Sequence, residues 1–180
     1  EDLKDRLRVP PDAAGAYLVT PAELLLCQAH CHLNTMIVSR PFYLALGGMD
    51  EGRRYECDRE IYLRAIDLAK RINLLQEVVS RHNIPDPAAK GSMSTAESEF
   101  SKRLYQLRVF DKTVLLSARP ELRRFAMRQR GYILKHISVA AAKQGLADCA
   151  AYYAQESLMT RLSVAWLTAS ARLGLRRPVA

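Results

Sequence analysis

The sequence contains neither a long apolar run nor a secretory leader. No stretch of its 180 residues approaches the roughly 18 consecutive apolar residues that a membrane-spanning helix requires. Residues 1–6 are mixed in charge and have no apolar core, so we do not expect them to be a signal peptide. Internal repeats and low-complexity tracts are also lacking, and the length is that of one ordinary globular domain. These absences predict a globular chain of the cytoplasm.

Cysteine is scarce, and its spacing fits no disulfide framework. Cys27, Cys31, Cys57 and Cys149 are the four cysteines, which favours a reducing compartment. Residues 27–32 do bring two cysteines and two histidines close together. Structural zinc sites usually take ligands from two separate short segments, however, and no second cluster follows. Because Cys27 and Cys31 lie one helical turn apart, we expect a buried apolar helix face rather than a zinc site.

Positive charge is what the chain has in excess. Its formal net charge is +8, and the basic residues gather at 119–135 and at 172–177. Such an excess suits nucleic acid, an anionic lipid surface or a small anionic substrate, and charge alone does not choose among them. Apolar residues recur through 119–135 at helical spacing, so its cations are expected to form a solvated face rather than a nucleic-acid surface. The segment from Trp166 to Arg177 joins apolar residues to arginines, and we expect peripheral contact with the cytoplasmic membrane there.

The first half of the chain predicts short helices and strands. Residues 1–20 are expected to be extended, because a residue that precedes proline is pushed out of the helical region. Thr20 and Pro21 favour the start of a helix that runs to about His30. The other predicted elements are strands at Leu33–Ser39 and Leu74–Ser80, a helical turn at Pro41–Leu46, an amphipathic helix at Asp58–Ile72 and a loop at Asn83–Ser94.

From Thr95 onward nearly every segment has helical periodicity. The pattern predicts three helices, at about 95–117, 120–143 and 146–173, with boundaries at Pro120 and Gly145.

We therefore expect an α+β fold that is predominantly α, divided into residues 1–94 and a helical extension at 95–180 of about three helices. Two predicted strands are too few for an independent sheet. The first portion is thus expected to complete a larger sheet.

A turn and a helix start carry the residues with the clearest chemistry. Gly47 and Gly48 precede an apolar residue and two acids, a layout suited to a tight turn beside a ligand. Farther along, Asp58 and Glu60 lie near the positive end of a predicted helix dipole. Acids at a helix start also serve stability alone, which is the plainer interpretation of either segment taken singly.

Together, these segments resemble the acceptor side of a family 2 glycosyltransferase of the GT-A fold. The order is a strand ending in Arg40, a short helix, the turn Gly-Gly-Met-Asp-Glu, and a helix that opens with an acid and contains Tyr62, Leu63 and Arg64. The resemblance covers about residues 25–95. It implies that residues 1–94 are the C-terminal part of such a domain.

The resemblance implies an inverting transfer in which Asp58 is the catalytic base. In this family an acidic pair opens the helix and its second member, here Asp58, takes the proton from an acceptor hydroxyl that attacks a nucleotide sugar. Cys57 stands where the family usually has Glu, and Glu56 is expected to supply part of the missing charge. The expected acceptor-binding residues are Gly48, Asp50, Glu51 and Glu56.

The resemblance also implies a donor side. Arg81 and His82 follow the second predicted strand, where the family often has an Arg/His pair. We expect Arg81 to contact phosphate and His82 to contact the divalent metal, Mg or Mn. No Asp-x-Asp motif or nucleotide-binding half precedes Leu33. Residues 1–180 alone are therefore expected not to turn over a nucleotide sugar, and the missing half is a required partner.

Two functions remain open. One is transfer of a sugar to a saccharide or lipid-linked acceptor, as in polysaccharide biosynthesis. The alternative is a non-catalytic helical interaction module that binds anionic surfaces or nucleic acid. The two differ at Asp58, because its replacement by asparagine abolishes transfer in an enzyme and is silent in a module.

Overall fold

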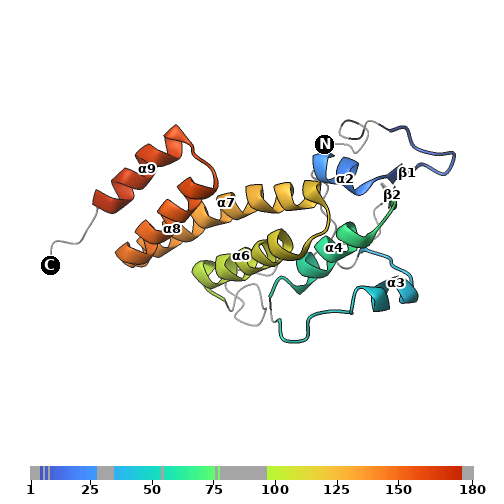
Figure 1. Ribbon diagram of the computed structural model, residues 1–180, viewed down its shortest axis with the longest axis horizontal. Helices are drawn as coiled ribbons and strands as arrows, with labels where there is room; N and C mark the ends of the chain where they lie inside the picture. The colour runs from blue at the N-terminus through green and yellow to red at the C-terminus, as the bar shows by residue number, and fades with distance from the viewer. Residues whose placement is uncertain are drawn as a thin grey trace. The chain divides into compact units, whose positions relative to one another are not determined.

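The computed structural model describes residues 5, 7, 9–27, 35–53, 55–75, 77 and 97–175, without the side chains of residues 27 and 172–175. In these ranges the chain forms seven helices and a two-stranded antiparallel sheet (Figure 1), so the predicted α+β, predominantly α class is confirmed. The chain divides into two compact units, Glu1–Ile84 with Leu116–Arg123, and Pro85–Leu115 with Arg124–Ala180. The predicted division at residues 94 and 95 falls outside the described residues.

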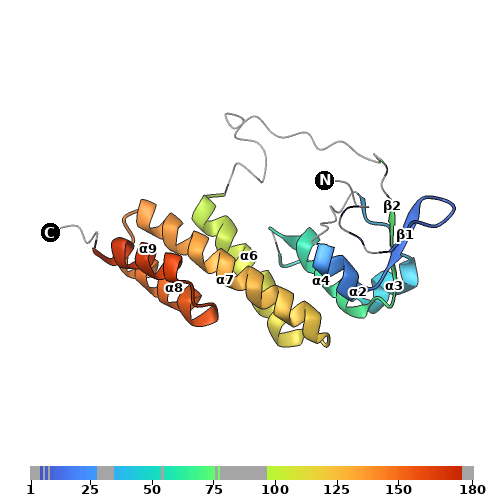
Figure 2. The ribbon, with the colours of Figure 1, turned by 90° about the horizontal axis from the view of Figure 1, so that it is seen from above.

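A short sheet lies in the first unit. Strand β1 (Ala16–Val19) pairs antiparallel with β2 (Ile72–Leu75), and Tyr17 is opposite Leu74. The two strands lie side by side in both views (Figures 1 and 2). Tyr17 and Val19 are buried, so one face of the sheet contributes to the core of this unit.

The predicted strands are partly wrong. In Leu33–Ser39, the described residues 35–39 form no strand, and Ile37 is 97% exposed. Strand propensity depends on a neighbouring strand and a buried face, and here Ser39 instead caps the following helix by accepting a hydrogen bond from the Phe42 N–H at 3.3 Å. The second strand begins two residues earlier than predicted, at Ile72, and much of 74–80 lies outside the described residues.

Strand β1 was predicted only as part of an extended lead-in. It follows a turn in which the Asp12 carboxylate accepts hydrogen bonds from the N–H groups of Ala14 and Ala16, both at 2.9 Å. The four residues Ala16–Val19 then meet a partner more than fifty positions away in the sequence. Local sequence does not reveal such a partner, which is why the strand was missed.

Three helices complete this part of the chain. The predicted cap of the first is confirmed, whereas the helix predicted at Asp58–Ile72 ends earlier, at Leu68. Helix α2 (Pro21–Cys27) opens with a reciprocal cap between Thr20 and Glu23, in which the Thr20 N–H donates to the Glu23 carboxylate at 2.7 Å. These bonds from Thr20 lower the pKa of Glu23 from its ordinary value. The other two helices are α3 (Arg40–Ala45) and α4 (Cys57–Leu68).

The end of α4 is fastened to the start of a later helix, α7 (Pro120–Lys143), within the same unit. The Asp67 carboxylate accepts hydrogen bonds from the Ser117 hydroxyl at 2.7 Å, from the Ala118 N–H at 3.0 Å and from the Arg119 N–H at 3.1 Å. The Arg119 guanidinium in turn donates to the backbone oxygens of Asp67 and Ala69. Asp67 therefore satisfies backbone groups just before α7 that lack a helical partner.

We predict that Asp67→Ala lowers the free energy of unfolding by about 1–2 kcal/mol, because it removes a capping carboxylate. Urea denaturation of the purified chain measures this change. The matched control is Glu121→Ala, which removes an acid from the first turn of α7 and is expected to change stability by less than about 0.5 kcal/mol. Equal effects of the two substitutions would contradict a capping role for Asp67.

The second unit is a bundle of helices. Helix α6 (Glu99–Leu116), α7 and α8 (Ala147–Thr160) lie side by side in both views (Figures 1 and 2). Phe110 of α6 meets Phe125 of α7 edge to face at 6.4 Å. Two buried serines form hydrogen bonds between α7 and α8. Ser157 of α8 donates to the Gly131 carbonyl of α7 at 3.0 Å, and Ser138 of α7 donates to the Ala150 carbonyl of α8 at 2.7 Å. The helices are therefore antiparallel neighbours.

Arg130 joins three helices of this bundle. Its guanidinium donates to Asp111 of α6 at 2.8 Å, and to Thr160 and Glu156 of α8 at 2.7 and 3.4 Å. The Arg130 side chain therefore donates hydrogen bonds to acceptors on both α6 and α8.

The predicted helix at 146–173 is wrong in one respect, because it breaks into α8 and α9 (Val164–Leu175). Arg161 is extended, with φ −155° and ψ 108°. Ser163 then starts the next helix, since its carbonyl accepts a hydrogen bond from the Leu167 N–H at 2.8 Å and its hydroxyl one from the Trp166 N–H at 3.4 Å. A cap of this kind competes with helix continuation. The predicted helices at 95–117 and 120–143 are confirmed within the described residues.

Among the described residues, none of the helices has the length and apolar character needed to cross a bilayer.

Candidate functional site

The turn that follows α3 has the tight geometry expected of Gly47 and Gly48. Both have positive φ, 80° and 70°, a region that glycine enters without strain. The Gly48 N–H donates to the Tyr43 carbonyl at 3.2 Å, and the Tyr43 hydroxyl accepts a hydrogen bond from the Met49 N–H, also at 3.2 Å. Met49 packs against the core formed by Leu46 and residues of α4. It is therefore the apolar anchor that the sequence predicts.

Arg64 fastens this turn to α4. Its guanidinium forms two hydrogen bonds with the Glu60 carboxylate, Nε to Oε1 at 2.9 Å and Nη2 to Oε2 at 2.6 Å. It also donates to the backbone carbonyls of Leu46 and Gly48, the latter at 2.7 Å. Glu60 is only 3% exposed, so Arg64 offsets the charge of a buried carboxylate. One side chain thus holds the Gly-Gly turn against the helix that begins beside Asp58.

We predict that Gly48→Ala lowers the free energy of unfolding by about 1–2 kcal/mol, because it forces an L side chain into the left-handed region. Space is not the obstacle, since an added Cβ would lie 3.5 Å from the Tyr43 hydroxyl. Thermal denaturation measures the loss. Gly52→Ala is the control, because Gly52 has no positive φ, and it is expected to be neutral or slightly stabilising. A neutral Gly48→Ala would contradict the turn geometry.

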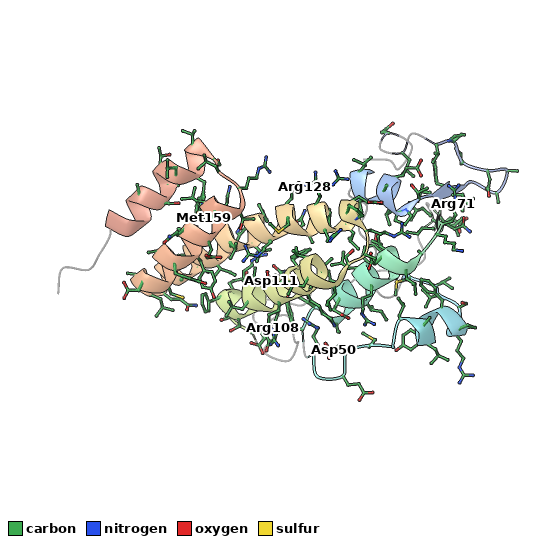
Figure 3. The ribbon with its side chains drawn as sticks, viewed as in Figure 1. Asp50, Arg71, Arg108, Asp111, Arg128 and Met159 are labelled. Atoms are coloured by element: carbon green, nitrogen blue, oxygen red, sulfur yellow. The ribbon has the colours of Figure 1, made fainter. Side chains whose placement is uncertain are left out.

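Asp50 and Glu51 lie in the next turn, on the loop between α3 and α4 (Figure 3). The Arg53 N–H donates to the Asp50 carbonyl at 3.0 Å, which closes the turn. The Arg53 guanidinium also pairs with the Asp50 carboxylate at 3.5 Å. The Glu51 side chain is exposed. The loop therefore presents one carboxylate that is paired and one that faces solvent.

The start of α4 contains a strained residue. Glu56, the residue before the helix, has φ 63° and ψ 23°, and it is the only non-glycine with positive φ among the described residues. A non-glycine residue in this region costs about 1–3 kcal/mol and persists only where the surroundings enforce it, often at functional sites. The Glu56 carboxylate pairs with the Arg59 guanidinium at 3.0 Å. Its charge is therefore offset by Arg59.

Asp58 occupies the first turn of α4 and is half-buried. Its Oδ1 accepts a hydrogen bond from the Arg59 N–H at 2.8 Å. Among the described residues it forms no ion pair, whereas Asp50, Glu56 and Glu60 each pair with an arginine. Cys57, beside Asp58, is a free thiol of intermediate exposure.

The donor-side predictions lie outside the described residues. These are Arg81 and His82. Most of the 27–32 segment, where a buried apolar helix face is expected, also lies outside the described residues. Among the described residues, no group of three or more His, Cys, Asp or Glu side chains is placed to hold a metal ion. The metal, Mg or Mn, remains a prediction from the resemblance.

The sequence interpretation gave no role to Tyr43 or to the Glu60–Arg64 pair. The pair could have been predicted from sequence, because Glu60 and Arg64 are four residues apart on a predicted helix and such residues are neighbours on its surface. The contacts of Arg64 to the carbonyls of Leu46 and Gly48 have no counterpart in local sequence.

Comparison of the chain with protein-family models, with curated proteins and with solved structures found no match.

Proposed function

We propose that the chain is the acceptor-side portion of a family 2 glycosyltransferase with Asp58 as its catalytic base. The observation that carries the proposal is the Asp58 carboxylate, which has no cationic partner among the described residues while its acidic neighbours Asp50, Glu56 and Glu60 each have one. A general base needs a lone pair that can reach the hydroxyl it deprotonates. Of these four carboxylates, Asp58 meets that requirement best.

The Arg64 contacts support the proposal in a second way. The resemblance rests on two segments, the Gly-Gly turn and the helix with its Leu63-Arg64, that are separate in the sequence. Arg64 bonds directly to Glu60 of the helix and to the carbonyls of the turn. The motif is therefore one connected piece of structure. Arg64 thereby connects the Gly-Gly turn to the helix that begins beside Asp58.

In the proposed reaction, Asp58 accepts the proton of an acceptor hydroxyl as that oxygen bonds to the anomeric carbon of the donor sugar. The bond from that carbon to the nucleotide diphosphate breaks with its electron pair, which leaves on the diphosphate, and attack from the opposite side inverts the anomeric configuration. Asp50 and Glu51 of the exposed turn are suited to accept hydrogen bonds from a saccharide or lipid-linked acceptor. The divalent metal would neutralise charge on the diphosphate, with His82 as the expected metal contact and Arg81 as the expected phosphate contact.

The test is sugar transfer by the complete enzyme, which includes the nucleotide-binding half, compared between wild type and Asp58→Asn. The proposal expects transfer by the wild type and its loss in the variant. A helical interaction module expects no transfer from either protein. Efficient transfer by residues 1–180 alone would contradict the proposal that a separate nucleotide-binding half is required.

A further inference from the structure

The second unit carries a row of cations along one side of α7. Arg124, Arg128 and Lys135 lie at helical spacings of four and seven residues, so they share one face. Arg124 and Arg128 are exposed and form no ion pair or side-chain hydrogen bond with any described residue. In Figure 3, Arg128 lies on the side of α7 that faces away from α6. These residues, with Arg161, are called the cationic row.

Arg161 joins the row because the end of α8 crosses α7 at Gly131. A Cβ at Gly131 would lie 3.3 Å from the Thr160 methyl and 3.8 Å from the Arg161 Cβ. Glycine therefore permits the close crossing. Arg161 is exposed, and it lies between the positions of Arg128 and Lys135 along α7. Asp111 and Glu156 of the neighbouring helices are both bonded to Arg130, and Glu121 in the first turn of α7 lies three residues before Arg124.

Beside the cationic row lies an exposed apolar patch at the corner between α8 and α9. Met159 is 81% exposed, Leu162 and Val164 are each 76% exposed, and Leu167 is 50% exposed. Residues 157–180 contain four arginines and no acid. Exposed apolar side chains that gather in one region are typical of an interaction surface. These four residues are called the corner patch.

Trp166 lies next to both features. It is half-buried, and the Lys135 ammonium lies 5.6 Å from the centre of its ring. Trp166 is the single tryptophan of the chain, and it follows directly after Val164 and Ala165 of the corner. Aromatic, apolar and cationic side chains together are the composition of a surface that lies at the boundary between lipid head groups and acyl chains.

We infer that the cationic row and the corner patch together dock on a lipid bilayer with anionic head groups. The cations match anionic head groups, and the corner patch gives apolar side chains that can enter the acyl boundary. A second copy of the chain fits less well, because a two-fold interface would place the cationic row against its own image. Nucleic acid would match the cations but would leave the corner patch exposed. The inference is independent of the proposed transferase activity.

The test is co-sedimentation of the full chain with phosphatidylcholine vesicles, with and without phosphatidylglycerol, and the fluorescence of Trp166 gives a second readout. We expect binding and a blue shift of the emission only with the anionic vesicles, weakening as salt is raised. R124Q/R128Q is expected to bind about thirtyfold more weakly, as for the loss of two interfacial charges. L162Q/L167Q is expected to bind at least about tenfold more weakly, because two apolar side chains no longer enter the bilayer.

The matched control is R108Q/L115Q, which removes an exposed arginine and an exposed leucine from α6 of the same unit. Figure 3 shows Arg108 on the opposite side of α6 from α7. Its binding is expected to change less than about twofold, within the usual range for neutral surface substitutions. Circular dichroism of each variant establishes that the fold is intact.

Three outcomes would overturn the inference. The first is no binding to anionic vesicles, and the second is equal loss in R108Q/L115Q and in the two test variants. The third is a dimer in lipid-free solution that L162Q/L167Q dissociates, since the corner patch would then be a contact between copies. Binding to duplex DNA that R124Q/R128Q abolishes and L162Q/L167Q leaves unchanged, without vesicle binding, would assign the row to nucleic acid instead.

Discussion

Replacing Asp58 by asparagine is expected to reduce sugar transfer by the complete enzyme at least about 10²-fold, the lower range for loss of a general base. The asparagine amide has nearly the same shape but cannot accept the proton of the acceptor hydroxyl. Stability is expected to change little, because Asp58 is half-buried and the described bond of its side chain is local, to the Arg59 N–H. The measurement is the initial rate of transfer with donor and acceptor in excess.

The matched control for Asp58 is Asp148→Asn. Asp148 is an exposed acid in the first turn of α8, so it shares the position of Asp58 at a helix start but lies in the other unit. Its replacement is expected to leave both transfer and melting temperature unchanged. If Asp58→Asn retains the wild-type rate, the helix start is only an electrostatically favoured place for an acid, and the chain is better explained as an interaction module.

Replacing Arg64 by methionine is expected to lower the free energy of unfolding by about 3–5 kcal/mol, because it removes the cation that forms two hydrogen bonds with a buried carboxylate. Glu60 is 3% exposed and receives two hydrogen bonds from this guanidinium. The carbonyls of Leu46 and Gly48 lose their donor in the same step. Urea denaturation measures the loss, and transfer by the complete enzyme is expected to fall as the Gly-Gly turn is released.

Two further variants separate the roles of Arg64. The double variant Glu60→Leu/Arg64→Met leaves neither charge of the pair buried, so most of the lost free energy of unfolding is expected to return. The Gly-Gly turn still lacks the Arg64 guanidinium as a hydrogen-bond donor, so sugar transfer is expected to stay low. Lys102→Met removes an exposed helical pair with Glu99 and is expected to cost less than about 0.5 kcal/mol. An Arg64→Met variant as stable as Lys102→Met would show that the Glu60 carboxylate is not held by this pair.

The fold was predictable where local rules decide it. Pro120 and the helical period give α7 its observed bounds, and Thr20 with Glu23 gives the start of α2. Prediction failed where a distant partner or a local cap decides the structure. Strand β1 depends on β2, the segment before Ser39 has no strand to pair with among the described residues, and Ser163 interrupts a continuous helical pattern.

The candidate site was predictable in outline. The positive φ of Gly47 and Gly48, the anchoring of Met49 and the place of Asp58 at a helix start all follow from residue type and spacing. The contacts of Tyr43 and Arg64 could not be predicted, because they bring a backbone N–H and two carbonyls of the turn to side chains six to eighteen residues away. The left-handed conformation of Glu56 likewise has no cause in its residue type.

The bond between Asp67 and the residues before α7 has a consequence for how this unit opens. Asp67 lies near the end of α4, and its carboxylate holds the N–H groups of Ala118 and Arg119, fifty-one and fifty-two positions later in the chain. The hydrogens of these two amides can exchange with solvent only when their hydrogen bonds to the Asp67 carboxylate break. Fraying at the end of α4 and exposure of the 117–119 backbone should therefore be a single cooperative event, with one opening free energy shared by two segments that are distant in the sequence.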